Sequence, residues 1–528
     1  MRVKSALILL VLAVLAIFSC RKETVASWDV DLTGPIVSSK LNIRHFLTDS
    51  LFTNDANGLL TLNVNREVAY IKVDSLLKIP DTTIVNSFFT PVLLTLSPGQ
   101  SMNLLPPTPL TFSIGDGVAL KYAIIRNGNL KIKYSNTISE PLSFLYILPG
   151  VKKYGQPLTI TEIIPPGNNS LVKTYPLDGY DIDLTAGGTA NFNTITQSYT
   201  VSLSQTANSV VANPGTGAKI ELSYSEIIPQ YARGYFGMQS VPVNIDTARL
   251  DIFKNFNATN FMLSDATLDF RIINEFGAEF NGSLSNIKSL NTINQSSVTL
   301  NTQQLSAINI NRAFAVNNVV NPTIKLISLN KNNSNILPFI SNLPDKLTYA
   351  GTINLNPLGN TSGFNDFAYY NTGIKVLADI KIPMKFMADA FLLQTVSPID
   401  FTNIEQLDNV NYGDFIIKAK NGYPFDAVLQ AYLVNDQNVV IDSLFVPGNN
   451  IIAKGITNAQ NVVISPSFQR LYIPFDNAKL QNIKKSKSVK LKARLNMPTP
   501  QPPEISIKDT YEIDIDIIMD VNYKVKRK

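Results

Sequence analysis

The sequence is poor in the side chains that most often carry chemistry. Its 528 residues include one cysteine, Cys20, and one histidine, His45. A Ser-His-Asp triad would have to use His45, but the sequence contains no Gly-x-Ser-x-Gly elbow. Zinc sites built from cysteine and histidine are excluded by the counts, and neither a Walker A nor a dinucleotide-binding glycine pattern is present.

The carboxylates give little further evidence of catalysis or metal binding. Asp181 and Asp183 alternate along an expected strand and are expected to face solvent. The segment Asp55-Ala56-Asn57-Gly58 lacks the spaced carboxylates of a calcium loop and is better explained as a hairpin turn. A glycosidase pair need not be close in sequence, so that alternative stays open. We therefore predict no enzymatic activity, no cofactor and no metal site.

The N-terminus has the features of a secretory signal peptide. Arg2 and Lys4 precede an unbroken apolar run from Ala6 to Phe18. This run is shorter than the roughly 20 residues that a membrane-spanning helix needs. The sequence therefore predicts export rather than a retained transmembrane helix.

Cys20 stands directly after this apolar run. The segment Ile17-Phe18-Ser19-Cys20, followed by Arg21-Lys22, resembles the relaxed lipobox of Bacteroidota lipoproteins. It departs from the commoner Leu-Ala-Gly-Cys form because Phe18 is bulky. The resemblance implies cleavage before Cys20, attachment of lipid (palmitate among its acyl chains) to that residue, and a lipid anchor in the outer membrane. An ordinary signal peptide is the alternative.

Composition limits the remaining classes. The formal net charge is +5, and removal of Arg2 and Lys4 with the signal lowers it by two, far from the strong positive field that nucleic-acid binding uses. Hydrophobic residues make up 45% of the chain, so it can bury cores rather than stay disordered. Its length requires several domains.

The periodicity is that of strands. Apolar and polar residues alternate in Leu130–Tyr134, Val489–Leu495 and Glu512–Ile517, which is typical of half-buried antiparallel strands. Pro-Gly and Asn-Gly turns separate such runs. We predict an all-β fold of tandem antiparallel β-sandwiches of immunoglobulin-like type with few short helices, at Met384–Leu393 and Asp476–Ile483.

Two markers recur along the chain. A strand that ends in asparagine and is followed by a turn former occurs at Leu130–Asn136, Leu268–Asn274 and Phe415–Asn421, with Pro141, Gly277 and Pro424 in the turns. A proline before an alternating stretch recurs at Pro109, Pro242 and Pro383. The two markers repeat with similar periods, which indicates repeated domains.

The predicted organisation follows from these markers. It comprises a signal peptide (1–19), a tether (20–27), a β-rich N-terminal portion (28–108) and three β-domain repeats (109–241, 242–382 and 383–528).

The C-terminal region carries patterned charge. Lys490, Lys492 and Arg494 share one face of an expected strand, and Glu512, Asp514 and Asp516 share one face of another. Their opposite charges suggest that these two strands pair in register. The basic tail Lys524–Lys528 is expected to be a solvated end, with contact to anionic lipid head groups as the alternative.

The only tryptophan, Trp28, is eight residues after Cys20. We expect it to plug the base of the first domain rather than to stack on a sugar. The predicted function is that of a non-enzymatic, outer-membrane-anchored lipoprotein serving as an envelope scaffold or binding subunit. The alternatives are a surface adhesin that binds polysaccharide, and an accessory subunit of an outer-membrane transport or assembly complex. The sequence leaves open whether the protein faces the periplasm or the cell surface.

Overall fold

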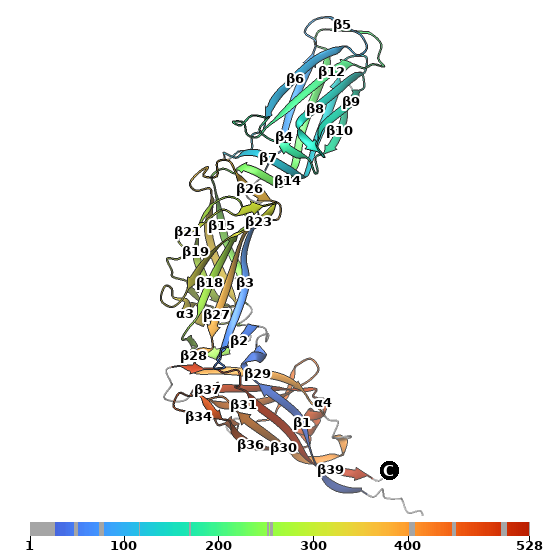
Figure 1. The fold of residues 1–528 in the computed structure, drawn as a ribbon. Helices are drawn as coiled ribbons and strands as arrows, with labels where there is room; N and C mark the ends of the chain where they lie inside the picture. Colours follow the sequence, from blue (N-terminus) through green and yellow to red (C-terminus); the bar gives the residue numbers. More distant parts are fainter. Residues whose placement is uncertain are drawn as a thin grey trace, which may run out of the picture. The chain divides into compact units, whose positions relative to one another are not determined.

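The computed structural model describes residues 27–46, 51–72, 79–115, 117–167, 170–250, 253, 257–400, 407–445, 450–497 and 504–526. Within these ranges nearly all regular structure is antiparallel strand (Figure 1). The all-β prediction is confirmed. No helix of the described residues is long and apolar enough to cross a bilayer.

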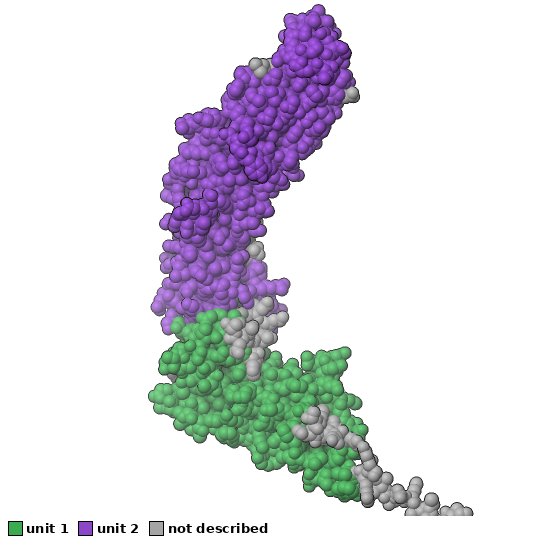
Figure 2. All heavy atoms as spheres, turned by 45° about the vertical axis from the view of Figure 1, so that its right-hand side comes forward, with its two compact units in different colours: residues 1–63, 250–265, 382–528 green, residues 64–249, 266–381 purple. Residues whose placement is uncertain are grey.

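The chain divides into two compact units that are discontinuous in sequence (Figure 2). Unit 1 comprises residues 1–63, 250–265 and 382–528, and unit 2 comprises residues 64–249 and 266–381. Unit 2 contains two β-sandwiches. We call them sandwich A (residues 79–235) and sandwich B (residues 64–72, 239–249 and 266–381); the sandwich of unit 1 is sandwich C.

Each sandwich contains four paired strands in the same order. In A they are part of a ten-stranded sheet and in B of a five-stranded sheet, whereas in C they make up the whole sheet. In each sandwich the first of the four in sequence pairs with the last, the last strand pairs with the strand that ends in the marker asparagine, and a fourth strand completes the set. These strands, in spatial order, are β4 (Thr82–Phe89), β14 (Gly217–Tyr235), β7 (Ala119–Asn136) and β10 (Ser170–Pro176) in A; β3 (Leu60–Lys72), β27 (Gly373–Pro383), β18 (Thr267–Asn274) and β24 (Thr323–Leu329) in B; and β1 (Ser27–Leu41), β39 (Ile513–Lys526), β30 (Val410–Asn421) and β36 (Ser467–Phe475) in C.

A second layer of strands faces these four in each sandwich. It is a separate sheet in B and C, but in A it is continuous with the first layer. The central pair of the second layer is β8 (Leu142–Lys153) with β12 (Thr194–Leu203) in A, β19 (Phe280–Asn291) with β25 (Lys346–Leu355) in B, and β31 (Asp426–Val434) with β37 (Ser488–Asn496) in C. The flanking strands are β6 (Ser101–Thr111) and β9 (Gln156–Ile164) in A; β15 (Gln239–Arg249), β20 (Ser296–Thr299) and β21 (Ile308–Ile310) in B; and β16 (Asn257–Thr259), β29 (Ala390–Pro398), β32 (Val440–Ser443) and β33 (Ile451–Ile452) in C.

Short elements complete the fold. In sandwich A, β11 (Asp181–Asp183) bridges β7 and β8, and β5 (Leu94–Leu96) pairs with β13 (Val210–Ala212). The others are β2 (Phe52–Asn54), β17 (Met262–Leu263), β22 (Phe314–Val316), β23 (Val319–Asn321), β26 (Asp366–Tyr369), β28 (Lys385–Met387), β34 (Ile456–Thr457), β35 (Val463–Ser465) and β38 (Ile505–Ser506), the helices α3 (Ile336–Ser341) and α4 (Asn477–Lys485), and the 3-10 turns η1 (Ile43–Phe46) and η4 (Leu407–Asn409).

The three sandwiches are nested rather than strung in tandem. β1, β3 and β4 follow one another in sequence, yet each is the first strand of a different sandwich: C, B and A respectively. Sandwich A is therefore inserted after the first strand of B, and B after the first strand of C. Residues 28–108, expected as one N-terminal portion, are shared among all three, because each first strand completes a sheet whose other strands come later.

The marker asparagines have the same structural role in each sandwich. Asn136, Asn274 and Asn421 are fully buried and end the strand that leads from one layer of strands to the other. The side-chain oxygen accepts from the backbone N–H two residues later, and the side-chain amide donates to the carbonyl four residues later. The respective distances are 2.8 and 2.8 Å for Asn136, 2.8 and 3.0 Å for Asn274, and 2.9 and 2.8 Å for Asn421.

The proline marker is less regular. Pro109 and Pro242 lie in the corresponding strands β6 and β15, which pair with β12 and β25. Pro383 ends β27 instead and belongs to a different position of the fold. Of the two sequence markers, only the asparagine therefore occupies the same structural position in all three sandwiches.

Of the two predicted helices, one is confirmed. α4 begins after Asp476, whose side chain accepts from the N–H of Lys479 at 2.9 Å, and it buries Leu480 and Ile483. The helix predicted at Met384–Leu393 is wrong. This segment forms β28 and the start of β29, because Phe386 and Leu393 are buried in paired strands and tertiary packing overrides local helix propensity.

Candidate functional site

Cys20 and His45, the two residues considered for a chemical role near the N-terminus, belong to the first segment of unit 1. Cys20 and the tether up to residue 26 fall outside the described residues, and β1 begins at Ser27. His45 belongs to η1, but its side chain is also outside the described set. Trp28 is 51% exposed, so its interpretation as a buried plug is wrong.

A polar groove of about 590 Å³ lies on the outer face of the four-stranded sheet of unit 1. Alternation along the strands turns polar side chains outward, while Ile513, Ile515 and Ile517 of β39 are fully buried on the other face. Two rows of cross-strand neighbours form the groove: Lys40, Asp514, Lys420 and Phe468, and then Ser38, Asp516, Lys418 and Arg470.

The first row contains a network of ion pairs. Lys40 Nζ lies 2.7 Å from Glu512 Oε1 and 3.4 Å from Asp514 Oδ1, and Lys420 Nζ lies 3.1 Å from the other oxygen of Asp514. The hydrogen bond to Glu512, together with the charges of Asp514 and Glu512, raises the pKa of Lys40. These contacts hold the side chains of three strands in place.

The second row is less completely paired. Ser38 donates to Asp516 at 2.8 Å. Arg470 contacts the Tyr472 hydroxyl at 3.4 Å, and among the described residues neither Arg470 nor Lys418 forms an ion pair with a carboxylate. Two cations at this row are therefore free to meet an anionic group of a ligand.

An aromatic ring borders the same groove. Phe468 is 75% exposed on β36, an edge strand of its sheet. A second hollow of about 200 Å³ adjoins the groove at Lys420 and is lined by Ile464, Thr510 and Glu512 among others. An exposed ring beside charged and hydroxyl groups suits a ligand with both an apolar face and polar substituents.

Opposite charges near the C-terminus do not pair as predicted. β37, with Lys490, Lys492 and Arg494, pairs with β29 and β31, whereas β39 pairs with β1 and β30. The prediction that these two strands pair is wrong. Each is an inner strand of a different sheet, and Asp514 of β39 forms ion pairs with Lys40 and Lys420 instead of with the β37 cations.

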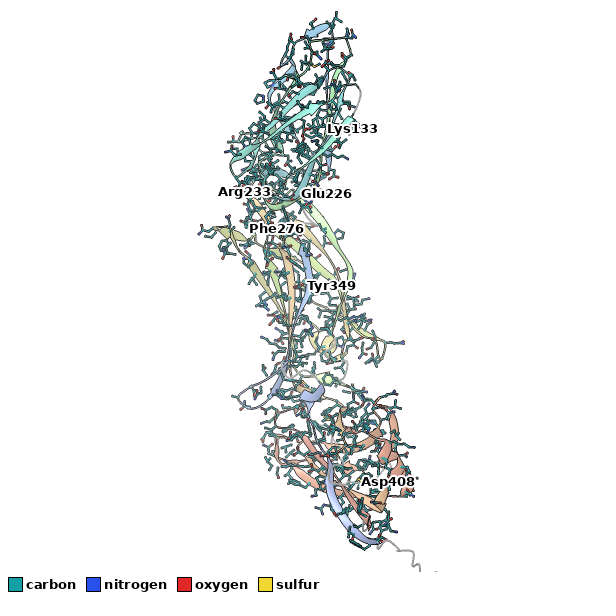
Figure 3. All side chains as sticks on the ribbon, turned by 90° about the vertical axis from the view of Figure 1, so that its right-hand side faces the viewer. Lys133, Glu226, Arg233, Phe276, Tyr349 and Asp408 are labelled. Carbon is teal, nitrogen blue, oxygen red and sulfur yellow. The ribbon has the colours of Figure 1, made fainter. Side chains whose placement is uncertain are left out.

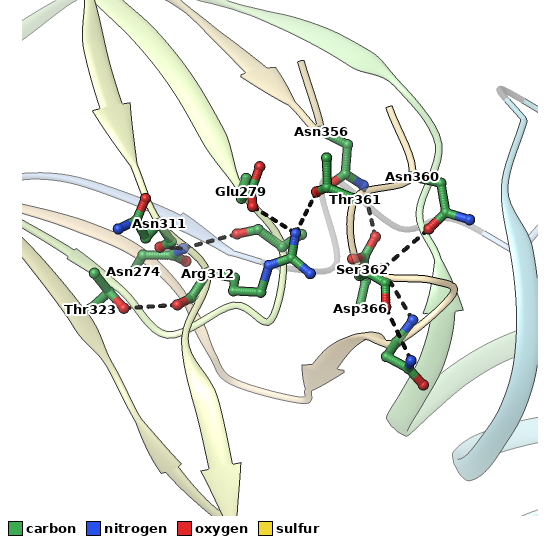
Figure 4. Close-up of polar contacts among 12 residues, drawn as sticks. Asn274, Glu279, Asn311, Arg312, Thr323, Asn356, Asn360, Thr361, Ser362 and Asp366 are labelled. Atoms are coloured by element: carbon green, nitrogen blue, oxygen red, sulfur yellow. Dashed lines mark hydrogen bonds and ion pairs between the residues drawn. The ribbon is translucent and has the colours of Figure 1, made fainter. Parts of the chain in front are cut away.

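Unit 2 has a polar cluster that is structural in character (Figure 4). Arg312 binds Glu279 at 2.7 Å and Thr361 at 2.5 Å. Asp366 is buried and accepts from Asn356 at 2.8 Å and from the backbone of Phe236 at 3.2 Å. These bonds tie the 356–366 segment to neighbouring strands and give the cluster a structural role, although Oδ1 of Asp366 is buried without a hydrogen-bond partner among the described residues.

The apolar cavities of unit 2 are small. Sandwich B encloses about 70 Å³, partly lined by Tyr349 (labelled in Figure 3). The hydroxyl of Tyr349 donates to the carbonyl of Val68 at 2.8 Å. Sandwich A encloses about 60 Å³. Ligand pockets usually occupy at least about 300 Å³, so these cavities are gaps in packed cores.

Within the described ranges, no three His, Cys, Asp or Glu side chains are grouped so that they could share a metal ion. The groove was not predicted from the sequence. The two-residue spacing of Lys418 and Lys420, and of Phe468 and Arg470, indicates that each pair faces the same side of its strand. It does not indicate that β1 and β39 contribute to the same surface.

No protein-family model and no curated protein matches the sequence. Among solved structures, the chain is similar to a protein of Parabacteroides distasonis described as secreted, with 10% identity and a TM-score of 0.26 over 55% of this chain and 83% of that one. A chain of Sulfolobus turreted icosahedral virus shares 10% identity at a TM-score of 0.13, covering 84% of this chain and 92% of its own. Similarities at this level carry no argument about function.

Proposed function

We propose that this chain is a lipoprotein of the bacterial outer membrane that is anchored through Cys20 and serves as a non-enzymatic scaffold or binding subunit of the envelope. The observation that carries the proposal is the position of Cys20, at the end of a short apolar run and seven residues before β1. A multiply acylated cysteine gives firm attachment, since each buried methylene contributes about 0.8 kcal/mol.

The fold is compatible with such an anchor. β1 pairs with β39 along almost its whole length, from Ser27 opposite Lys526 to Leu41 opposite Ile513. A pull on the tether would therefore load a strand that is hydrogen-bonded to β39 over most of its length.

Metabolic labelling tests the anchor. Cells that express the protein are grown with alkyne palmitate, and the labelled protein is detected after separation of the membranes. We expect label on the wild type and none on Cys20→Ala, which should move to the soluble fraction. Equal labelling of the two proteins, or no label on either, would refute the anchor.

A second candidate, binding of an acidic polysaccharide, is favoured by the groove. Lys418 and Arg470 suit carboxylate or sulfate groups, and Phe468 offers an apolar surface for a sugar ring. This ligand class fits the adhesin alternative better than the scaffold one.

Binding measurements on the full mature chain test this candidate. We expect Phe468→Ala and Arg470→Ala to weaken binding of an anionic polysaccharide about tenfold each, with no change for Lys485→Ala, an exposed cation of α4 outside the groove. Equal affinity in all variants would place any binding elsewhere.

A further inference from the structure

The two ends of the described chain form a paired ribbon in unit 1. Residues Ser27–Leu32 of β1 lie opposite Val521–Lys526 of β39 in continuous antiparallel register. Figure 1 shows these ends of β1 and β39 side by side, with the C-terminus marked next to them. Because side chains alternate, the ribbon has two distinct faces.

One face is polar and internally bonded. Asn411 donates to Asn522 at 2.8 Å and to Asp29 at 3.4 Å, and Asn522 donates to Asp31 at 3.2 Å. This network is exposed to solvent, as expected for a hydrated sheet surface.

The other face is apolar and only partly covered, with Asn409 of η4 donating to the Tyr523 hydroxyl at 3.2 Å. Trp28 is 51% exposed and Leu32 is 36% exposed, and Val30, Tyr523 and Val525 beside them are only partly buried. Farther along the same face, Met519, Ile517 and Leu41 are fully buried. The ribbon therefore extends past the hydrophobic core and leaves a partly exposed apolar patch, formed by Trp28, Val30, Leu32, Tyr523 and Val525.

The distance to the anchor is short. Ser27 is seven residues after Cys20, so the start of the ribbon lies within about 25 Å of the lipidated residue even if the tether is fully extended. Lys524, at the same end, is exposed. Tryptophan and tyrosine prefer the boundary between lipid and water, because an apolar ring and a polar tip are both satisfied there. Lysine near this boundary complements anionic head groups.

We propose that this apolar patch lies in the head-group region of the membrane that holds the anchor, so that the protein contacts the lipid surface through protein side chains as well as through Cys20. The proposal rests on the lipid anchor of the proposed function. It makes the bilayer interface the partner of the patch, and it sets which end of unit 1 faces the membrane.

Trp28 supplies the test, because it is the only tryptophan in the chain. The lipidated full-length protein is reconstituted into phosphatidylethanolamine–phosphatidylglycerol vesicles with or without brominated acyl chains, and tryptophan emission is recorded. We expect a blue-shifted emission that brominated lipid quenches. Relative to Cys20→Ala protein in buffer, we expect a fall of about twofold in quenching by aqueous acrylamide.

The matched control moves the single tryptophan. Trp28→Phe combined with Tyr154→Trp places it at a position that is 94% exposed in unit 2. We expect this variant to show red-shifted emission, full acrylamide quenching and no effect of bromine. Equal bromine quenching at both positions, or none at Trp28, overturns the proposal. Protection of Trp28 from acrylamide in Cys20→Ala protein without vesicles also overturns it, because another part of the chain or a second copy would then cover the patch.

Failure of the anchor and failure of the patch are separable. If palmitate labelling of Cys20 is absent, the proposed anchor fails. If the label is present and the vesicles carry the protein, but Trp28 behaves as in buffer, the anchor stands and the membrane contact of the patch is refuted.

Discussion

At the scale of single residues, Asn136, Asn274 and Asn421 connect the sequence to the fold most directly. The side chain of each bonds backbone groups of a turn that would otherwise be buried without hydrogen-bond partners. Asn274 and Asn421 also donate to a carbonyl of a more distant loop, at Asn311 and Ala453. Few other side chains as short as asparagine carry both a hydrogen-bond acceptor and two N–H donors.

Asn421→Ala should destabilise sandwich C by about 3 kcal/mol, because the N–H of Tyr423 and the carbonyls of Phe425 and Ala453 lose their partners in a buried site. Urea unfolding followed by circular dichroism measures the loss. The control is Asn332→Ala, at an exposed turn position, which should change stability by less than about 0.5 kcal/mol. Comparable stability of the two variants would contradict the structural role of the buried asparagine.

Buried tyrosines of sandwich A predict a pH dependence. Burial raises the pKa of Tyr224 to about 12, and burial, with the neighbouring Tyr224, raises the pKa of Tyr146 well above its usual value. The two hydroxyls lie 3.0 Å apart. A folded pKa above the unfolded value means that the folded state holds the proton more tightly, so this stability is complete below pH 10 and is lost as the pH rises toward 12.

We therefore expect alkaline unfolding of sandwich A between about pH 10 and pH 12, with the late tyrosine ionisation at 295 nm coinciding with loss of the β-sheet dichroism signal. Complete ionisation near pH 10 in a chain that stays folded would show that these tyrosines are accessible.

At the scale of elements, alternation identifies strands but not their partners. β37 and β39 carry complementary charges and nevertheless belong to different sheets. The pairing of β1 with β39 rests on the apolar inner faces and on continuous backbone hydrogen bonding, while surface ion pairs such as Lys40–Glu512 add little.

The single confirmed helix offers an element-scale prediction. Asp476→Ala removes the side-chain acceptor for the Lys479 N–H at the start of α4 and should cost about 1 kcal/mol in unfolding free energy. Asp436→Ala, at an exposed turn, is the control and should be neutral. The comparison is made by urea unfolding, and equal stability of the two variants would argue against the cap.

At the scale of the whole molecule, nesting determines which pieces can fold. The eight main strands of sandwich A, from β4 to β14, lie within residues 79–235, and of the described strands in their sheet only the short edge strand β26 comes from outside this range. Sandwich C, in contrast, needs β1 from one end of the chain and β39 from the other, and the hydrogen bond from Thr33 to Asp520 spans 487 residues.

Fragments test this organisation. Residues 79–235 should unfold cooperatively on their own, whereas residues 383–528 should not fold, because β39 would lose β1 and expose an apolar edge. Joining residues 27–63 to the second fragment through a flexible linker should restore protection of β39 amides in hydrogen exchange. Cooperative folding of 383–528 alone would contradict the dependence on β1.

Sequence alone was sufficient for the properties set by local alternation and by recurrence. Leu130–Tyr134, Val489–Leu495 and Glu512–Ile517 read as strands because a two-residue period allows only one side to be buried, and the three asparagines mark the same turn at a regular interval. The groove and the nesting were decided by tertiary structure. Any strand with the same alternation is an acceptable neighbour locally, so only packing of the complete chain determines that β1 lies beside β39 and brings Lys40 to Asp514, Lys420 and Phe468.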